Sequence, residues 1–479
     1  MASSYKTPGV YIEEISKLPP SVAQVETAIP AFIGYTHKAT KLAANDLLFN
    51  PTRIRSLSEY VKYFGTVNKD DTIIKVTITT DSSGAISAIT PKLDTSGSLY
   101  MMYYSLQMYF DNGGGPCYII SVGTTDSVPT SSALNPLVTG SASTSLDFEY
   151  GLQKLGLEDE PTLIVFPDAH LLNDASYYSI YEKALNQCHE LKDRFAIIDV
   201  KMKVDGTHTG LSSGYDEIAL MRNISSSYLS YGGAYYPGVK TSLNYVYNEQ
   251  NVVVFDSSGV TDLKSLKSSN SLKYNRVLAE ITKQLTVEMA PGAIIAGIYA
   301  WVDDQRGVWK APANVGLTKV IKPVKEITDE DQESLNVDTT AGKSINVIRS
   351  FKGLGVYVWG ARTLAGNDNE WRYLSVRRFY NMVEESVKKS SSWVVFEPND
   401  ANTWVKVKSM IENYLTVLWR QGALAGAVPE HAFFVKVGLG VTMTSLDILE
   451  GRMNIEIGMA VVRPAEFIIL KFSHKMQES

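Results

Sequence analysis

The chain has few residues of the kinds that build covalent or metal-bound frameworks. It contains 2 cysteines, Cys117 and Cys188, which are too few for a disulfide framework or a four-ligand zinc site. Its 6 histidines include no pair three or four positions apart, so local spacing predicts no metal site. We expect the fold to depend on hydrophobic cores, with Cys117 as a small buried core residue.

Long apolar runs and dense positive charge are also absent. The longest apolar runs, such as residues 467–470, fall far short of the roughly 18–20 residues that a membrane span requires, so we expect no direct membrane insertion. The N-terminus lacks the apolar stretch of a secretory signal, which favours folding in a cytoplasm. The net charge is −6 without a stripe of Lys and Arg, which disfavours nucleic-acid binding.

Charge is divided unevenly along the chain. Residues 345–479 carry a net charge of +3, and residues 1–344 carry a net charge of −9. A weakly basic C-terminal region is compatible with an acidic protein partner, although the pattern favours an ordinary solvated face.

The length predicts several domains. A chain of 479 residues is long enough for about two to four cores, since single cores rarely grow beyond ~250–300 residues. We predict an N-terminal arm at 1–25, an outer or inserted part at 26–344, a core domain at 345–465 and a C-terminal arm strand at 466–479. Residues 329–344 are acidic and polar, which predicts an exposed connector before the core domain.

Strand and helix patterns alternate in the first part of the chain. Apolar runs predict strands at 31–35, 117–122, 163–168 and 195–200, and helical spacing predicts helices near 58–65, 99–110 and 178–193. Such alternation is the signature of an α/β layer. Residues 72–93 alternate around a polar turn and predict a β-hairpin inserted at the surface, within about 68–98. Residues 127–145 predict a loop, and the topology of 240–275 is not defined by its pattern.

The last part predicts a mixed β-sheet flanked by helices, so the whole chain has the pattern of a multidomain α+β or α/β protein. A helix is expected at 377–390, and the longest amphipathic helix begins at the cap Asp400 and ends at Gly422. Strands are expected at 433–437, 453–462 and 467–472. The last of these lacks alternation, which is typical of a strand covered on both faces.

Both chain ends have strand character without an obvious partner. Prolines flank the first segment, and its unpaired backbone must find another sheet in this chain or in a neighbouring one. The two predicted arm strands consist of Val10, Tyr11, Ile12, Glu13, Glu14 and Ile15, and of Phe467, Ile468, Ile469, Leu470, Lys471 and Phe472.

Three sequence features invite a catalytic or ligand-binding interpretation. Residues 341–344 read Ala-Gly-Lys-Ser, but Val337 stands where a phosphate-binding loop needs its first glycine. Asp168 follows a predicted strand and either acts at a sheet edge or caps a turn. The pair Asp303 and Asp304 either binds a divalent ion with its surroundings or forms a solvated salt bridge with Arg306. We expect no catalytic residue, no cofactor and no metal.

Several sequence blocks resemble the family of contractile tail sheath proteins of phages, R-type pyocins and extracellular contractile injection systems. The blocks occur in family order at residues 8–14, 28–36, 110–118, 307–314, 371–378, 419–426 and 462–467, so that together they span nearly the whole chain. The stretches 72–93 and 240–275 do not match and are interpreted as peripheral additions.

The resemblance implies a structural protein that forms stacked, hexameric helical rings around an inner tube and contracts to drive that tube through a cell envelope. It implies assembly in a bacterial cytoplasm, release as a particle or part of a phage tail, and contacts to baseplate and terminator proteins. The arms would complete sheets in neighbouring copies. Candidate tube-facing residues are Lys406, Lys408, Arg420 and Arg452. A non-contractile tube or capsid-like protein is the alternative, and an enzyme acting through Asp168 is a third.

Overall fold

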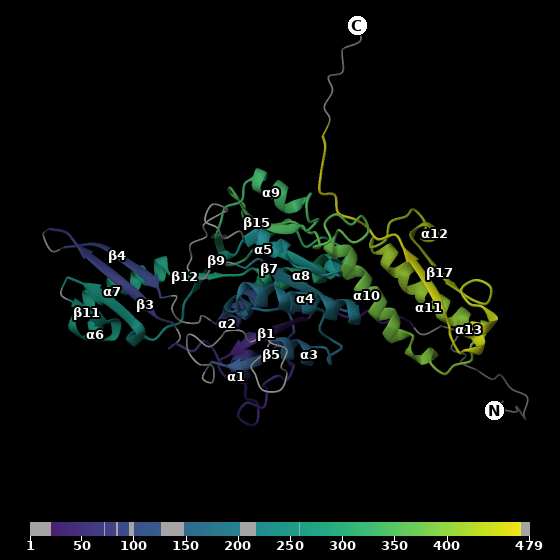
Figure 1. Cartoon of the computed structure of the whole chain (residues 1–479), viewed down its shortest axis with the longest axis horizontal. Helices are drawn as coiled ribbons and strands as arrows, with labels where there is room; N and C mark the ends of the chain where they lie inside the picture. Colours follow the sequence, from purple (N-terminus) through teal and green to yellow (C-terminus); the bar gives the residue numbers. More distant parts are fainter. Residues whose placement is uncertain are drawn as a thin grey trace, which may run out of the picture. The chain divides into compact units, whose positions relative to one another are not determined.

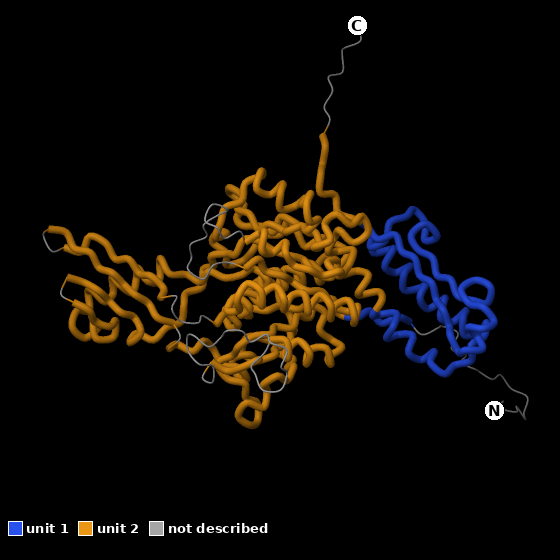
Figure 2. Tube along the Cα trace, viewed as in Figure 1, with its two compact units in different colours: residues 1–25, 385–462 blue, residues 26–384, 463–479 orange. Residues whose placement is uncertain are grey.

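The computed structural model describes residues 21–70, 72–82, 85–94, 100–125, 148–201, 217–257 and 259–470. Two compact units are described separately. Unit 1 comprises residues 1–25 and 385–462, and unit 2 comprises residues 26–384 and 463–479 (Figure 2). This division differs from the expected domain limits, because the strands between 345 and 359 belong to the large sheet of unit 2.

Unit 2 is built on a nine-stranded sheet in the order β13-β16-β15-β8-β7-β6-β1-β5-β2 (Figure 1). The inner strands run parallel: β1 (Pro30–Thr36), β5 (Cys117–Thr124), β6 (Leu163–Val165), β7 (Phe195–Asp199), β8 (Gly232–Tyr236) and β15 (Ile345–Phe351). Antiparallel strands flank them: β2 (Thr52–Ile54), β16 (Gly355–Trp359) and β13 (Val315–Gly316). The predicted α/β layer is therefore confirmed.

Helices cover both faces of this sheet, which explains why its strands are apolar throughout. On β1, Phe32 faces the cluster that contains α2 (Met102–Asp111) and α8 (Gly292–Arg306). The next residue, Ile33, faces the cluster that contains α3 (Phe148–Leu155) and α4 (Asp174–Leu191). Successive side chains of a strand point to opposite faces, so one apolar run fills two cores. Cys117 is buried, as expected.

The predicted hairpin is confirmed, and it belongs to a second sheet. Strands β3 (Ile74–Thr80) and β4 (Ile86–Leu93) pair antiparallel. They combine with β10 (Val252–Asp256) and β11 (Gly259–Asp262) in the order β11-β10-β3-β4. Helices α6 (Leu263–Ser269) and α7 (Ser271–Gln284) complete a core with this sheet. The two stretches that looked like separate additions thus form one folded module.

The other elements of unit 2 are short. A three-stranded sheet contains β9 (Val239–Asn244), β12 (Thr286–Met289) and β14 (Val320–Pro323). Helices α1 (Leu57–Phe64) and α5 (Glu217–Arg222) lie between strands along the chain, and Gly65 ends α1 with φ of +78°, as its position predicts. The connector expected at 329–344 is wrong in part, because residues Asp329–Asn336 form helix α9 with Leu335 buried.

Unit 1 is organised around the long helix α11 (Ala401–Arg420). Asp400 caps it by accepting a hydrogen bond from the Thr403 N–H at 3.0 Å, and Gly422 follows its end with φ of +83°. Its predicted apolar stripe is buried. The unit also contains the end of α10 (Leu374–Ser390), α12 (Pro429–Ala432), α13 (Ser445–Leu449), and strands β17 (Phe433–Val437) and β18 (Ile455–Met459).

Candidate functional site

Strands β17 and β18 of unit 1 form a sheet of only two strands. They pair antiparallel from Phe433 opposite Met459 to Val437 opposite Ile455. Val435 is buried on the side of α11, whereas Phe434 is exposed on the other face and lies across Gly458, where any side chain would collide with its ring. The glycine therefore lets an aromatic ring cover the outer face of the sheet.

Both long edges of this sheet are open within the part of the chain that the structure describes. One bridge, between Leu424 and Val461, extends pairing beyond the end of β18. Two-stranded sheets are marginally stable alone, and open edges present N–H and C=O groups that can accept another strand. Open edges of this kind meet the geometric requirement for strand addition.

The C-terminal segment has the opposite character, because it offers an extended apolar stretch without a sheet. Phe467, Ile468, Ile469 and Leu470 are 71–79% exposed and belong to no strand in the described residues. Figure 1 shows this yellow segment leaving the body of unit 2. The expected cover on both faces is thus not supplied by the residues that the structure describes. The predicted arm residues Lys471 and Phe472, and the whole N-terminal arm strand at 10–15, lie outside the described residues.

The four candidate cations differ in their surroundings. Lys406 and Arg420 are exposed on α11 and form no ion pair with any described residue. Lys408 pairs with Glu412 at 3.7 Å, and Arg452 pairs with Glu450 at 2.7 Å. All four remain predicted contacts with an acidic partner, and Lys406 and Arg420 are the two without an ion pair among the described residues.

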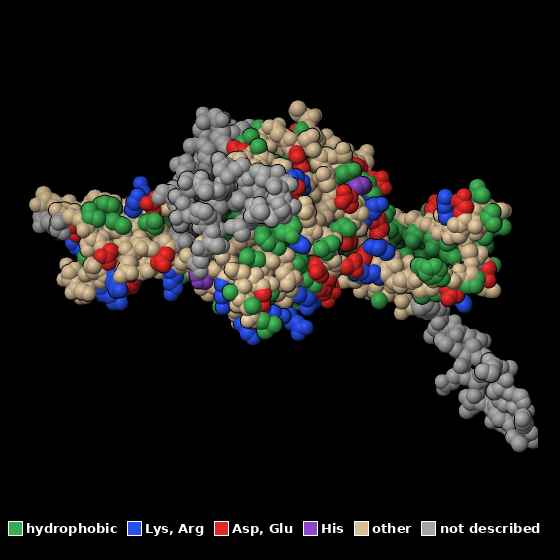
Figure 3. Space-filling view, turned by 60° about the horizontal axis from the view of Figure 1, so that its bottom comes forward, with side chains coloured by type: hydrophobic (Ala, Val, Ile, Leu, Met, Phe, Trp, Pro, Cys, Tyr) green, Lys and Arg blue, Asp and Glu red, His purple; other side chains and the backbone are tan. Residues whose placement is uncertain are grey.

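Unit 1 also exposes apolar side chains outside the two-stranded sheet, visible as green patches in Figure 3. Phe396 is fully exposed and has φ of +71°. It stands third in a turn closed by the Glu397 N–H donating to the Val394 carbonyl at 3.0 Å, with Val395 at φ −63° and ψ 125°. This type II turn favours glycine where Phe396 stands, so the ring is retained at a cost in backbone strain.

The features tested for chemistry have structural roles. Asp168 is buried and accepts hydrogen bonds from the backbone N–H groups of Tyr35 and Met101, so it fixes the start of α2. Burial raises its pKa to about 7, against the lowering effect of these donors. Asp199 likewise accepts from the Gly292 N–H at 2.7 Å at the start of α8, and burial raises its pKa to about 7. Both carboxyl groups anchor helices.

In the loop at 338–344, backbone N–H groups bind the carboxylate of Asp338, which belongs to the same loop. Asp338 accepts hydrogen bonds from the N–H groups of Thr340, Ala341 and Lys343 at 3.0–3.2 Å. Burial acts to raise the pKa of Asp338, but these donors lower it below its ordinary value. Lys343 donates to the carbonyl oxygens of Arg222 and Ile224. Groups that would hold a phosphate are therefore already occupied by the chain itself.

Neither interpretation of Asp303 was right. Its carboxylate pairs with Arg378 of α10, and the two side chains are 6% and 3% exposed. Asp304 instead accepts a hydrogen bond from Gln305 at 2.6 Å. Among the described residues, no three His, Cys, Asp or Glu side chains lie close enough to hold a metal ion. No helix in those ranges has the length and apolarity needed to cross a membrane.

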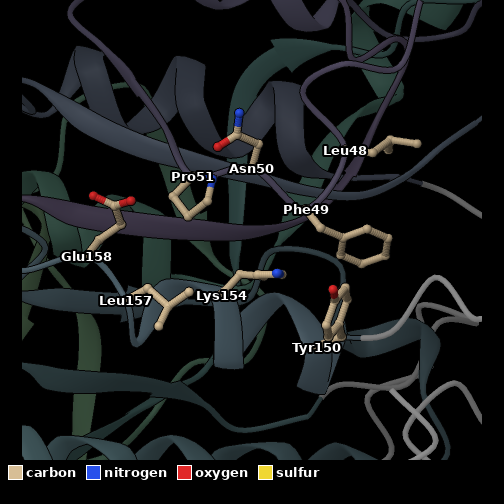
Figure 4. A pocket seen from close by; sticks show the side chains of 8 residues that line it. All are labelled: Leu48, Phe49, Asn50, Pro51, Tyr150, Lys154, Leu157 and Glu158. Carbon is tan, nitrogen blue, oxygen red and sulfur yellow. The ribbon is translucent and has the colours of Figure 1, made fainter. Parts of the chain in front are cut away.

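A surface cavity of about 440 Å³ lies beside β2 and α3 in unit 2. In Figure 4 the rings of Phe49 and Tyr150 lie edge to face, with centroids 4.9 Å apart and planes inclined by 61°, and Lys154 lies close to Tyr150. The side chains that line the cavity include no histidine, cysteine or serine.

Comparison with known proteins gives one consistent result. Residues 232–364 match the phage tail sheath protein central domain, and residues 366–475 match the phage tail sheath C-terminal domain. A putative prophage major tail sheath protein of Pseudomonas aeruginosa is 27% identical over 136 residues, which is 28% of this chain and 34% of the relative. Matches to the curated relatives span about a third of their length or less.

Solved structures match over almost the entire chain. A chain of the contracted sheath complex of the extracellular contractile injection system PVC is 29% identical, with a TM-score of 0.62 and 99% of each chain covered. A chain of the anti-feeding prophage baseplate is 32% identical, with a TM-score of 0.62, 99% of this chain and 100% of that chain covered.

Proposed function

The chain belongs to the family of contractile tail sheath proteins, and we infer that it is the structural subunit of a contractile sheath. Copies of this chain assemble helically around an inner tube and shorten together to drive that tube through a cell envelope. The matches described above are sheath domains and chains of contractile particles, which favours a contractile sheath over the non-contractile tube or capsid-like alternative.

The observation on which this proposal rests is that the same chain has an open two-stranded sheet and a separate exposed apolar segment near its C-terminal end. We propose that Phe467–Phe472 of one copy adds to the β17–β18 sheet of a neighbour, and that Val10–Ile15 of another copy adds to the same sheet. Main-chain hydrogen bonds between strands are indifferent to side-chain rearrangement elsewhere. Subunits can therefore stay connected while their other surfaces exchange contacts.

The near-full-length structural matches favour an extracellular injection particle over a phage tail. We propose that the particle assembles in a bacterial cytoplasm from stacked rings of six copies, and that it contacts the inner tube and the baseplate. The extended sleeve is metastable and consumes no nucleotide. A gain of ~1.4 kcal/mol per subunit shifts each local equilibrium about tenfold, and many linked copies add such gains.

The purified chain is expected to polymerise without any partner. Electron microscopy of the concentrated protein should show wide hollow tubules with a helical repeat, whereas a tube protein would give narrow cylinders and a capsid protein closed shells. A monodisperse monomer at high concentration would rule out the proposed assembly.

We propose that the exposed face of α11 contacts the inner tube. Lys406 and Arg420 are separated by 14 residues, or about 21 Å along the helix. We expect the double variant Lys406→Glu, Arg420→Glu to lower co-sedimentation with the inner tube at low salt by at least about tenfold, because two attractive charges become repulsive. Tubules of the variant alone should form normally.

A matched control is Lys264→Glu with Arg276→Glu, which makes the same change of charge at exposed positions of the second-sheet module. This control should bind the tube like the unmodified chain. Equal loss of binding in both double variants would show that net charge, and not the face of α11, governs the contact.

A further inference from the structure

Arg362 is a buried cation whose backbone is fixed by a neighbouring side chain. It is 4% exposed and follows β16 in unit 2. The Arg362 N–H donates to Asn346 Oδ1 at 2.7 Å, and Asn346 Nδ2 donates to the Arg362 carbonyl at 2.8 Å. Asn346 lies on β15, so the large sheet fixes both the N–H and the carbonyl group of Arg362.

The guanidinium of Arg362 is oriented as well. Its Nη1 donates to the Asn336 carbonyl at 3.1 Å, at the end of α9. This contact leaves Nε and Nη2 side by side and facing the C-terminal segment. A guanidinium edge held in this way matches a carboxylate with two parallel hydrogen bonds.

Glu466 fills that position. Arg362 Nε donates to Glu466 Oε1 at 2.9 Å, and Nη2 donates to Glu466 Oε2. The side chains are 5% and 17% exposed, and the hydrogen bond to Glu466 raises the pKa of Arg362 although burial acts to lower it. Within the described segment 463–470, Glu466 is the residue whose side chain is hydrogen-bonded to unit 2. The next four residues are the exposed apolar stretch.

We propose that Arg362 is a carboxylate receptor that fixes Glu466 as the root of the donated C-terminal strand. This inference rests on the proposed sheath function. With the root in place, the free arm begins at residue 467, and tension on it enters the large sheet of unit 2 through Arg362. Without the root, the next residue with a fixed backbone is Val462, whose N–H donates to the Ala423 carbonyl at 3.2 Å. The arm would lengthen by four residues, or about 13–14 Å.

Such slack matters for a contractile assembly. A tether of fixed length limits how far two connected copies can separate, whereas a longer tether allows several spacings. Arg362 and Glu466 are therefore positioning residues: they contact no partner in the proposal, and they determine where the contacting strand starts.

The test measures the freedom of the arm in the unassembled chain. Nitroxide labels on Ile468→Cys and Lys352→Cys, both exposed in unit 2, report their distance distribution by pulsed electron paramagnetic resonance. The native cysteines are buried, which favours selective labelling. We expect Glu466→Gln to broaden the distribution at least twofold, and Glu450→Gln, at an exposed carboxylate of unit 1, to leave it unchanged. An unchanged width in Glu466→Gln would overturn the proposal.

A polymerisation assay distinguishes failure of this proposal from failure of the proposed strand donation. Glu466→Gln without labels retains the apolar strand and should form pelletable polymer within about twofold of the unmodified yield. Ile468→Asp retains the root and should lose polymer. If Ile468→Asp polymerises normally, strand donation is wrong, while the label distances still decide whether Arg362 fixes the segment. If Glu466→Gln abolishes polymer with unchanged label distances, Glu466 acts in assembly directly and the root proposal fails.

Discussion

Deletion of residues 467–479 is expected to abolish polymerisation and leave the subunit folded. The deleted stretch includes four apolar side chains that are 71–79% exposed and contribute to no described core. Loss of exposed residues typically changes the free energy of unfolding by about 0.5 kcal/mol or less. Sedimentation velocity should therefore report monomers, with the thermal unfolding of the full chain preserved.

The size of the effect follows from what a donated strand buries. Each of the four side chains gains roughly 1.5–3 kcal/mol on full burial. Ordering the backbone costs roughly 1–2 kcal/mol per residue. Counted over these four residues, burial of roughly 6–12 kcal/mol exceeds an ordering cost of roughly 4–8 kcal/mol by about 2–4 kcal/mol for each arm. This gain recurs at every arm contact of the sleeve, so its loss prevents assembly. Leu42→Asp is a suitable control, because Leu42 is an isolated exposed apolar residue of unit 2. Normal tubules from the truncated chain would contradict strand donation.

The sequence predicted those elements whose signals are local. The parallel strands appear as apolar runs because each fills two cores, and α11 is recognisable from the cap at Asp400, its apolar stripe and Gly422. The run without alternation at 467–472 predicted a strand covered on both faces, but residues 467–470 are exposed and form no strand among the described residues. Donation of this segment to a neighbouring copy therefore stays a prediction.

The sequence did not reveal which distant segments meet. Val252 pairs with Ile74 across the second sheet, and nothing near either residue encodes that partnership. Asp303 and Arg378 are likewise far apart in sequence, so neighbouring Arg306 looked like the obvious partner. Helix α9 was missed although a local signal existed. Thr328 and Asp331 form a capping box, which was outweighed by the acidic composition of the stretch.

Asp303→Asn is expected to be the most destabilising single substitution discussed for unit 2. Arg378 donates to Asp303 Oδ1 at 3.0 Å, to Asp303 Oδ2, and to the Thr27 carbonyl at 2.9 Å, and it lies 4.4 Å from the centre of the Tyr299 ring. Removal of one partner leaves a buried charge uncompensated, which costs about 3–5 kcal/mol. In a unit of this size the unfolding temperature of unit 2 should fall by about 4–6 °C, measured by scanning calorimetry.

The neighbouring residue supplies the control for this prediction. Asp304 is exposed, so Asp304→Asn should change the unfolding temperature by about 2 °C or less. Arg378→Met alone should also be costly, because it leaves the Asp303 carboxylate buried without its cation. The double variant Arg378→Met, Asp303→Asn should destabilise unit 2 by less than the sum of the two single changes. It removes both charged groups, so no buried charge is left without a partner. Additive effects would show that the two groups act separately. Because Thr27 Oγ1 also donates to Asp303 at 2.6 Å, loss of the pair would loosen the chain where it enters unit 2 from its N-terminal end.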